Sequence, residues 1–340
     1  AHVSIAVALT VSILPVFLFL VALVLLDSYK LIPLRAILLA VAVGAAAGVV
    51  AFLVNVSLEP ALGLSISQYS KYVAPFPEEL LKAAYIIFLL RRNKIGFVVD
   101  AATYGFAVGT GFAFIENIYS LDIHPNLTIW TWVIRGFGTA LMHGGATSIF
   151  AMISRTLHNR VPKFRLALVL PGLAVSILLH SLYNRFLVSP LLATALIVLV
   201  FPYIAMFLFQ KSERETKSWI GTGFDTDQEL LRVMRAGEVS DTPVGLYLKG
   251  MRTSFPPEVI VDMMCLLRLR AELGIKAKGI LLMREAGFEA DHDPSLPAKL
   301  EEVRYLERNI GRTVRVARKP DVETSTQDLW QLTRLNGTQR

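Results

Sequence analysis

Acidic, basic and imidazole side chains occur in stretches of this sequence that are otherwise almost wholly apolar. Glu78 and Glu79 precede Lys82 by about one helical turn, so on a helix the lysine can pair with either glutamate. Further apolar stretches carry a carboxylate and two imidazoles, at Glu116, His143 and His180. Ionisable groups are costly inside a bilayer, and in a membrane-spanning helix they predict a functional site. Carboxylates beside imidazoles could hold a water molecule and take its proton.

Two forms of this chemistry fit the residue types. In the first, Glu116, His143 and His180 bind a zinc ion and leave a fourth position for water, with Glu78 or Glu79 as the general base. In the second, no metal takes part: a glutamate activates the water, and the histidines and Asn184 stabilise the oxyanion. Spacing alone does not choose between them.

The composition indicates which elements position these residues. Hydrophobic residues make up 54% of the 340 residues and charged residues 18%, below the roughly one quarter charged that is typical of soluble domains. Residues 1–210 hold 13 Lys and Arg and 7 Asp and Glu, whereas residues 211–340 hold 21 and 20. These values exclude a single soluble globule and a disordered chain. They also argue against nucleic-acid binding, because the soluble-looking part has no concentrated basic face.

The predicted fold is all-α, with a polytopic transmembrane domain in residues 1–210 and a small helical domain in residues 211–340. A bilayer core needs about 20 apolar residues per helix. About seven stretches meet this need, near residues 3–26, 32–57, 76–90, 97–120, 129–154, 166–187 and 190–210. The third is short, so we expect it to begin earlier or to be tilted.

Basic residues between the spans predict the orientation. Arg91, Arg92 and Lys94 follow the third span, and the first and fifth loops are also basic. Basic loops stay cytoplasmic, which places the N-terminus outside and the C-terminal domain in the cytoplasm. In this orientation most of the intramembrane carboxylates and imidazoles share the outer half of the bilayer. Glycines at 105, 109, 144 and 145 predict close approach of the helices that carry them.

The C-terminal domain shows helical patterns without a catalytic constellation. We predict one helix over residues 259–273, ended by Gly274, a second over 275–286, ended by Gly287, and a third over 298–310. His292 lies between two aspartates, which we interpret as a solvated loop rather than a metal site. Cys265, the one cysteine, is expected to be buried as a small apolar residue.

Together the residues of the membrane part resemble the PrsW-type intramembrane proteases. Glu78 to Lys82 matches the EExxK motif of that family, and Phe112 to Asn117 matches its FxxxEN motif. His143 and His180 take the places of the family's remaining histidines, and Asn184 completes an HxxxN pattern. The resemblance covers roughly residues 70–190. The related CAAX prenyl proteases have EExxxR and FxxxH instead, so prenylated substrates do not follow from it.

This resemblance implies an intramembrane endopeptidase of bacteria or archaea that cuts a membrane-anchored protein, such as an anti-sigma factor. Its catalytic residues would be Glu78, Glu79, Glu116, His143, His180 and Asn184, with Lys82, Asn117 and Phe112 in support. The expected partners are a single-span membrane protein and the lipid bilayer, not nucleic acid, and the number of chains in the assembly stays open, a homo-oligomer included. The alternatives are a proton- or ion-coupled transporter that uses the Glu and His residues as a relay, and a scaffold whose polar core fixes helix packing.

Overall fold

The computed structural model describes residues 4–27, 32–123, 128–159, 164–185, 187, 189–251, 255–286, 288 and 293–310. Within these ranges the chain is helical and has no strand. It divides into two compact units, Ala1–Glu213 and Arg214–Arg340. The division falls inside one long helix, α9 (Pro190–Ala236), which continues the last apolar stretch into the second unit.

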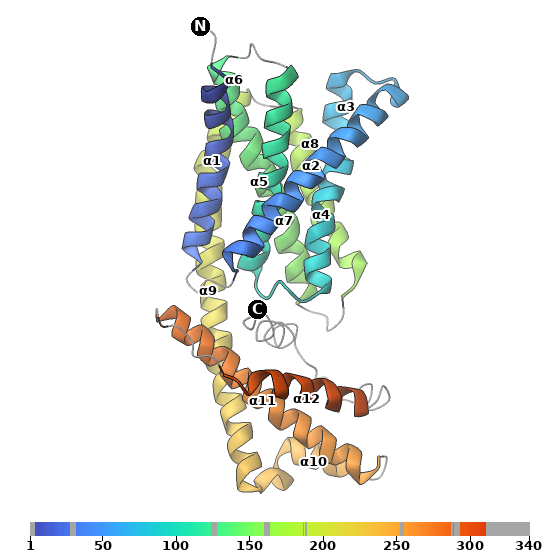
Figure 1. The fold of residues 1–340 in the computed structure, drawn as a ribbon, viewed down its shortest axis with the longest axis vertical. Helices are drawn as coiled ribbons and strands as arrows, with labels where there is room; N and C mark the ends of the chain where they lie inside the picture. Colours follow the sequence, from blue (N-terminus) through green and yellow to red (C-terminus); the bar gives the residue numbers. More distant parts are fainter. Residues whose placement is uncertain are drawn as a thin grey trace. The chain divides into compact units, whose positions relative to one another are not determined.

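The first unit is a bundle of helices (Figure 1). In chain order they are α1 (Ile5–Leu26), α2 (Leu34–Leu62), α3 (Ile66–Tyr72), α4 (Pro75–Arg91), α5 (Val98–Ile123), α6 (Ile129–Ile134), α7 (Ala140–His158) and α8 (Leu170–Asn184), followed by the first part of α9. A π-helical turn (Arg135–Thr139) joins α6 to α7, and a 3-10 turn (Leu166–Val169) precedes α8.

Helices occupy all seven stretches predicted to cross the membrane. Five of the described helices are long and apolar enough to do so by length and composition alone: Ile5–Leu26, Leu34–Leu62, Val98–Leu121, Leu166–Asn184 and Pro190–Arg214. The third stretch forms α4, which has 17 residues and carries the charged residues of the first motif. The fifth is divided by the π-helical turn. The prediction of an all-α polytopic membrane bundle is confirmed.

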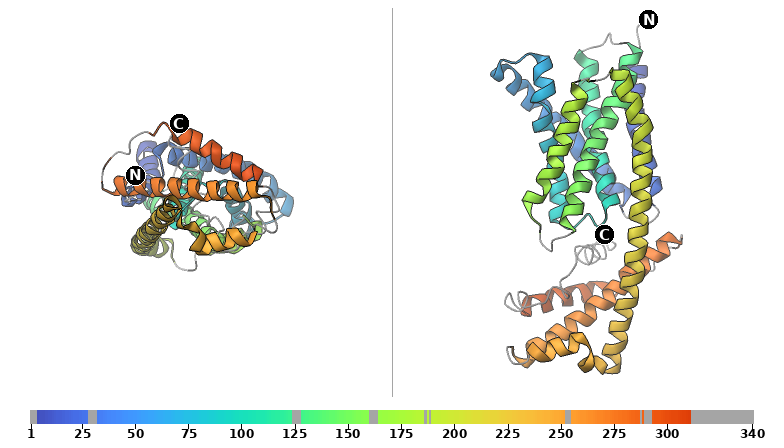
Figure 2. Two further views of the ribbon diagram at one scale, coloured as in Figure 1. Left: turned by 90° about the horizontal axis from the view of Figure 1, so that it is seen from below. Right: turned by 180° about the vertical axis from the view of Figure 1, so that it is seen from behind.

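Helices α5 and α7 lie side by side at the centre of the bundle, and α8 packs against the other side of α7 (Figures 1 and 2). Glycine makes the central contact possible, as the sequence predicted. A Cβ atom on Gly109 of α5 would lie 2.4 Å from the carbonyl oxygen of His143 in α7, and one on Gly105 would lie 2.6 Å from that of Thr147. The two backbones therefore touch at the level of His143.

Replacing Gly109 with alanine is expected to force these two helices apart. The added methyl group would meet backbone rather than a movable side chain, and overpacking of this kind costs about 1–3 kcal/mol. Thermal unfolding of the purified protein in detergent should show a lower midpoint for Gly109→Ala. Gly221→Ala is the matched control, because a Cβ atom there would have no neighbour within 4 Å. Equal midpoints for the two variants would contradict the close approach.

The second unit is also helical. After α9 it contains α10 (Pro243–Met251), α11 (Pro257–Glu285) and α12 (Leu296–Asn309), with a 3-10 turn at Glu238–Asp241. Side chains such as Leu266, Leu273 and Leu300 form its core.

Two predictions for this unit were wrong. The helices expected over 259–273 and 275–286 are one helix, α11, because Gly274 costs only about 1 kcal/mol relative to alanine inside a helix, and buried Leu273, Ala277 and Leu281 continue the apolar face past it. Cys265 is exposed, not buried. The third predicted helix is confirmed as α12. His292 and the residues after 310 lie outside the described part of the chain.

Candidate active site

The first motif lies in the first two turns of α4, which begins at Pro75. Proline suits this position because its missing N–H needs no partner there. One turn later, Glu79 and Lys82 form an ion pair in which both side chains are almost fully buried. Glu79 also accepts a hydrogen bond from His180 of α8, over 2.9 Å between Oε1 and Nδ1. The Glu79 carboxylate is therefore occupied by its contacts with Lys82 and His180.

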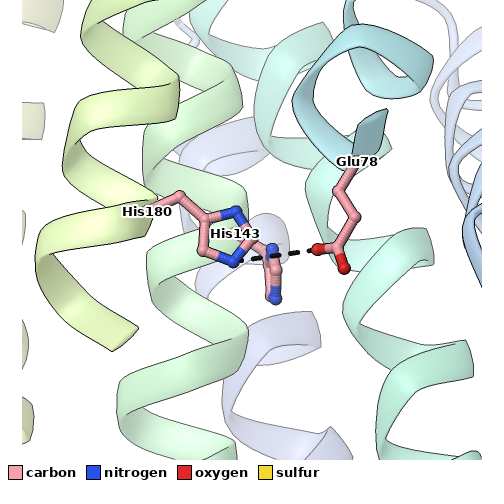
Figure 3. Close-up of side chains that lie close together, drawn as sticks. All are labelled: Glu78, His143 and His180. Atoms are coloured by element: carbon pink, nitrogen blue, oxygen red, sulfur yellow. Dashed lines mark ion pairs between the residues drawn. The ribbon is translucent and has the colours of Figure 1, made fainter. Parts of the chain in front are cut away.

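Glu78 faces a different set of partners. Its Oε1 atom accepts a hydrogen bond of 2.8 Å from the side-chain amide of Asn55 in α2. Its Oε2 atom lies 3.7 Å from His180 Nε2, as the dashed line in Figure 3 marks. This distance is too long for a direct hydrogen bond. Glu78 therefore presents one fixed oxygen and one that faces the histidines.

The two histidines are held in different tautomers. His180 Nδ1 donates to the Glu79 carboxylate, so Nε2, which faces Glu78, carries the lone pair. His143 Nδ1 lies 3.0 Å from Lys82 Nζ. Because an ammonium group only donates, this Nδ1 is the acceptor and the ring proton is on Nε2. The rings meet edge to face, with centroids 4.7 Å apart.

Glu116 of α5 lies on the other side of His143. Its Oε2 atom is 2.5 Å from His143 Nε2, and its Oε1 atom is 3.1 Å from an Arg135 guanidinium nitrogen. The Glu116 side chain is 33% exposed, compared with 1% for Glu79, so it is the more accessible of the two carboxylates. Arg135 begins the π-helical turn, a feature that is frequent at functional sites.

The supporting residues of the second motif pack around this centre. The centroid of the Phe112 ring lies 5.1 Å from that of the His143 ring. It also lies 4.6 Å from Lys82 Nζ, with which the ring makes a cation–π contact. The amide of Asn117 accepts from Arg135 Nε over 2.9 Å and donates to the carbonyl oxygen of Ser12 in α1 over 2.8 Å. Asn117 thereby ties Arg135 and α1 to α5.

Asn184, predicted to be catalytic, makes a contact of another kind. Its amide nitrogen donates to the carbonyl oxygen of Ser70 over 2.9 Å, and Ser181 donates to the carbonyl oxygen of Lys71 over 2.6 Å. Both bonds attach the end of α8 to α3. In this structure Asn184 fixes the short helix that leads into α4, and its role as an oxyanion donor stays a prediction.

Three of the side chains form a potential metal site. Among the described residues, one ligand atom each of Glu78, His143 and His180 lies within 4.8 Å of the others (Figure 3). Two imidazoles and one carboxylate are the donor set of many catalytic zinc sites, so the residues fit that metal in type. The sequence predicted Glu116 as the carboxylate ligand, whereas the structure groups Glu78 with both histidines.

Two residues near the site were not among those predicted from the sequence. Asn55 lies within an apolar span, where a polar side chain is itself a signal. Tyr69 donates to Asn55 Oδ1 over 2.8 Å, and nothing in the sequence around it indicates this.

Residues 32–209, more than half of the chain, match the family described as PrsW family intramembrane metalloprotease. The match reaches beyond residues 70–190 at both ends and includes α2 with Asn55. No curated protein and no solved structure matches the chain.

Proposed function

The chain belongs to the PrsW family of intramembrane metalloproteases, and we propose that it hydrolyses a peptide bond of a single-span membrane protein near the outer face of the membrane. The observation that carries this proposal is the cluster of Glu78, His143 and His180 inside a bundle of apolar helices. Family membership makes the chain an integral membrane peptidase, and it favours proteolysis over the transporter and scaffold alternatives. An anti-sigma factor is a substrate of the proposed kind.

In this proposal Glu78, His143 and His180 hold the metal. Zinc bound there would act as a Lewis acid and lower the pKa of a bound water molecule. The carboxylate of Glu79 accepts from His180 Nδ1 and so keeps the Nε2 lone pair directed to the site. Glu78 takes the ligand role predicted for Glu116, and Glu116 becomes the group that moves protons.

Glu116 suits proton transfer because of its neighbours. It lies 2.5 Å from His143 Nε2, the atom that carries the ring proton. Its Oε2 atom, which faces His143, is buried, although the side chain as a whole is one-third exposed. Arg135 at 3.1 Å holds the other oxygen of Glu116 in place. The Lys82 ammonium, buried against Glu79 and Phe112, orients the His143 ring from its other nitrogen.

The position of the cut follows from the proposed orientation. Basic loops support an external N-terminus and a cytoplasmic domain from about residue 211 that supplies no catalytic group. Glu78 lies in the first turn of α4, and with the third span running inward this turn is near the outer surface. A site at that depth can be wetted through a shallow cavity.

We therefore expect substrates to be cut near the outer border of their span. Membranes of cells that express the wild-type protein or Glu78→Gln are compared by mass spectrometry of new protein N-termini. N-termini that require the active protein should map to the outer third of single-span helices. If they map to the cytoplasmic third, both the proposed depth and the orientation are wrong.

A further inference from the structure

Glu78 is held by a chain of hydrogen bonds that begins outside the two motifs. Tyr69 of α3 donates to Asn55 of α2, and Asn55 donates to Glu78 of α4, with 2.8 Å at each step. Three separate helices thus meet at one carboxylate oxygen. Tyr69 is 4% exposed, so the chain begins at a side chain that is itself fixed by packing.

The chemistry of the groups sets the direction of these bonds. A carboxylate only accepts, so Asn55 must present its NH₂ group to Glu78 Oε1. The amide oxygen of Asn55 then faces Tyr69, whose hydroxyl must donate. Each group has one arrangement that satisfies its partner, and this holds Glu78 Oε1 in place.

We propose that Asn55 and Tyr69 are positioning residues, which hold Glu78 Oε1 so that Oε2 faces His180 and the metal site. This inference rests on the proposed function. A carboxylate at the start of α4 could otherwise turn away from the histidines, because the 3.7 Å between Oε2 and His180 Nε2 does not hold it there. Partners of this kind typically change metal affinity or activity by about 10–100-fold when they are removed.

The test uses the whole 340-residue chain and four substitutions. Asn55→Leu keeps the size of the side chain and removes the donor. Leucine also suits the apolar helix in which it is placed. Asn55→Asp keeps the shape but places a second acceptor against Glu78. Tyr69→Phe removes only the hydroxyl group. Ser57→Leu is the control, because Ser57 lies on the exposed side of α2 and, within the described residues, its hydroxyl group donates to the Leu53 carbonyl group of its own helix.

Four quantities are measured for each protein: zinc retention against a competing chelator, kcat and KM with one single-span substrate, and the thermal midpoint. Asn55→Leu and Asn55→Asp should retain zinc about 10–100-fold more weakly and lose kcat by a similar factor. KM should stay near the wild-type value, since no substrate contact is removed. The midpoint should fall modestly, because Tyr69 and Glu78 each lose a hydrogen-bond partner. Zinc retention and kcat of Tyr69→Phe should fall by a smaller factor. Ser57→Leu should match the wild type in every quantity.

A purely structural role for Asn55 would lower the midpoint and leave zinc retention and kcat per folded molecule unchanged, and this result would overturn the inference. So would wild-type values for both Asn55 variants. A wild-type protein that neither cleaves nor retains zinc would instead overturn the proposed function, and the inference with it. A wild type that cleaves while Asn55→Leu does the same overturns the positioning role alone.

Discussion

Glu78→Gln is expected to abolish both zinc binding and proteolysis and to leave the fold intact. Glutamine keeps the shape and can still accept from Asn55, but it lacks the charge that a ligand of this metal supplies. A catalytic metal contributes several kcal/mol, and about 1.4 kcal/mol corresponds to a tenfold rate, so kcat should fall by roughly a thousandfold or more.

Metal analysis, cleavage of a single-span substrate and thermal unfolding are measured on the same preparation. The thermal midpoint should stay close to that of the wild type, because the Asn55 hydrogen bond remains possible. Glu59→Gln, on α2 and outside the cluster, is the matched control for the loss of one carboxylate. Near-normal cleavage by Glu78→Gln, or a full zinc content, would remove Glu78 from the site.

Glu79→Gln is expected to lose stability as well as activity. The Lys82 ammonium is fully buried and pairs with Glu79, and removing one partner of a buried pair costs about 3–5 kcal/mol. Cleavage per folded molecule should also fall by about 10–100-fold, because a neutral amide orients His180 less firmly than a carboxylate does. Thermal unfolding and cleavage assays measure the two effects separately.

The double variant Glu79→Gln with Lys82→Met provides the control. It removes the unpaired charge, so much of the stability should return while activity stays low. An unchanged midpoint in Glu79→Gln alone would mean that the buried pair does not stabilise the protein. Full activity of the double variant would mean that neither residue positions the histidines.

The cluster itself could be predicted from the sequence because each member stands out in an apolar stretch. Glu78, Glu116, His143 and His180 come from four helices, α4, α5, α7 and α8, and a shared depth in the membrane was enough to bring them together. The glycines of α5 and α7 likewise indicated where the two backbones touch. Residue types and the boundaries of the spans are therefore enough to predict the cluster and the contact between α5 and α7.

The assignment of partners could not be predicted, because it depends on the rotation of each helix. The rotations of α4 and α5 decide whether Glu78 or Glu116 is grouped with both histidines, and adjacent Glu78 and Glu79 diverge by about 100° on α4. Asn55 reaches Glu78 only through the packing of α2 on α4. The continuity of α11 through Gly274 shows the same limit, since core contacts there outweigh a local preference.

The central claim is that this cluster hydrolyses a peptide bond with water. Its most direct test reconstitutes the purified wild-type protein and Glu78→Gln in liposomes with a single-span substrate, in water enriched in ¹⁸O. We predict that the wild type yields two fragments whose masses add up to the substrate plus one water, with the heavy oxygen in the new carboxylate near the outer border of the span, and that Glu78→Gln yields none. Intact substrate with the folded, zinc-loaded wild type, or equal cleavage by both proteins, would contradict the account.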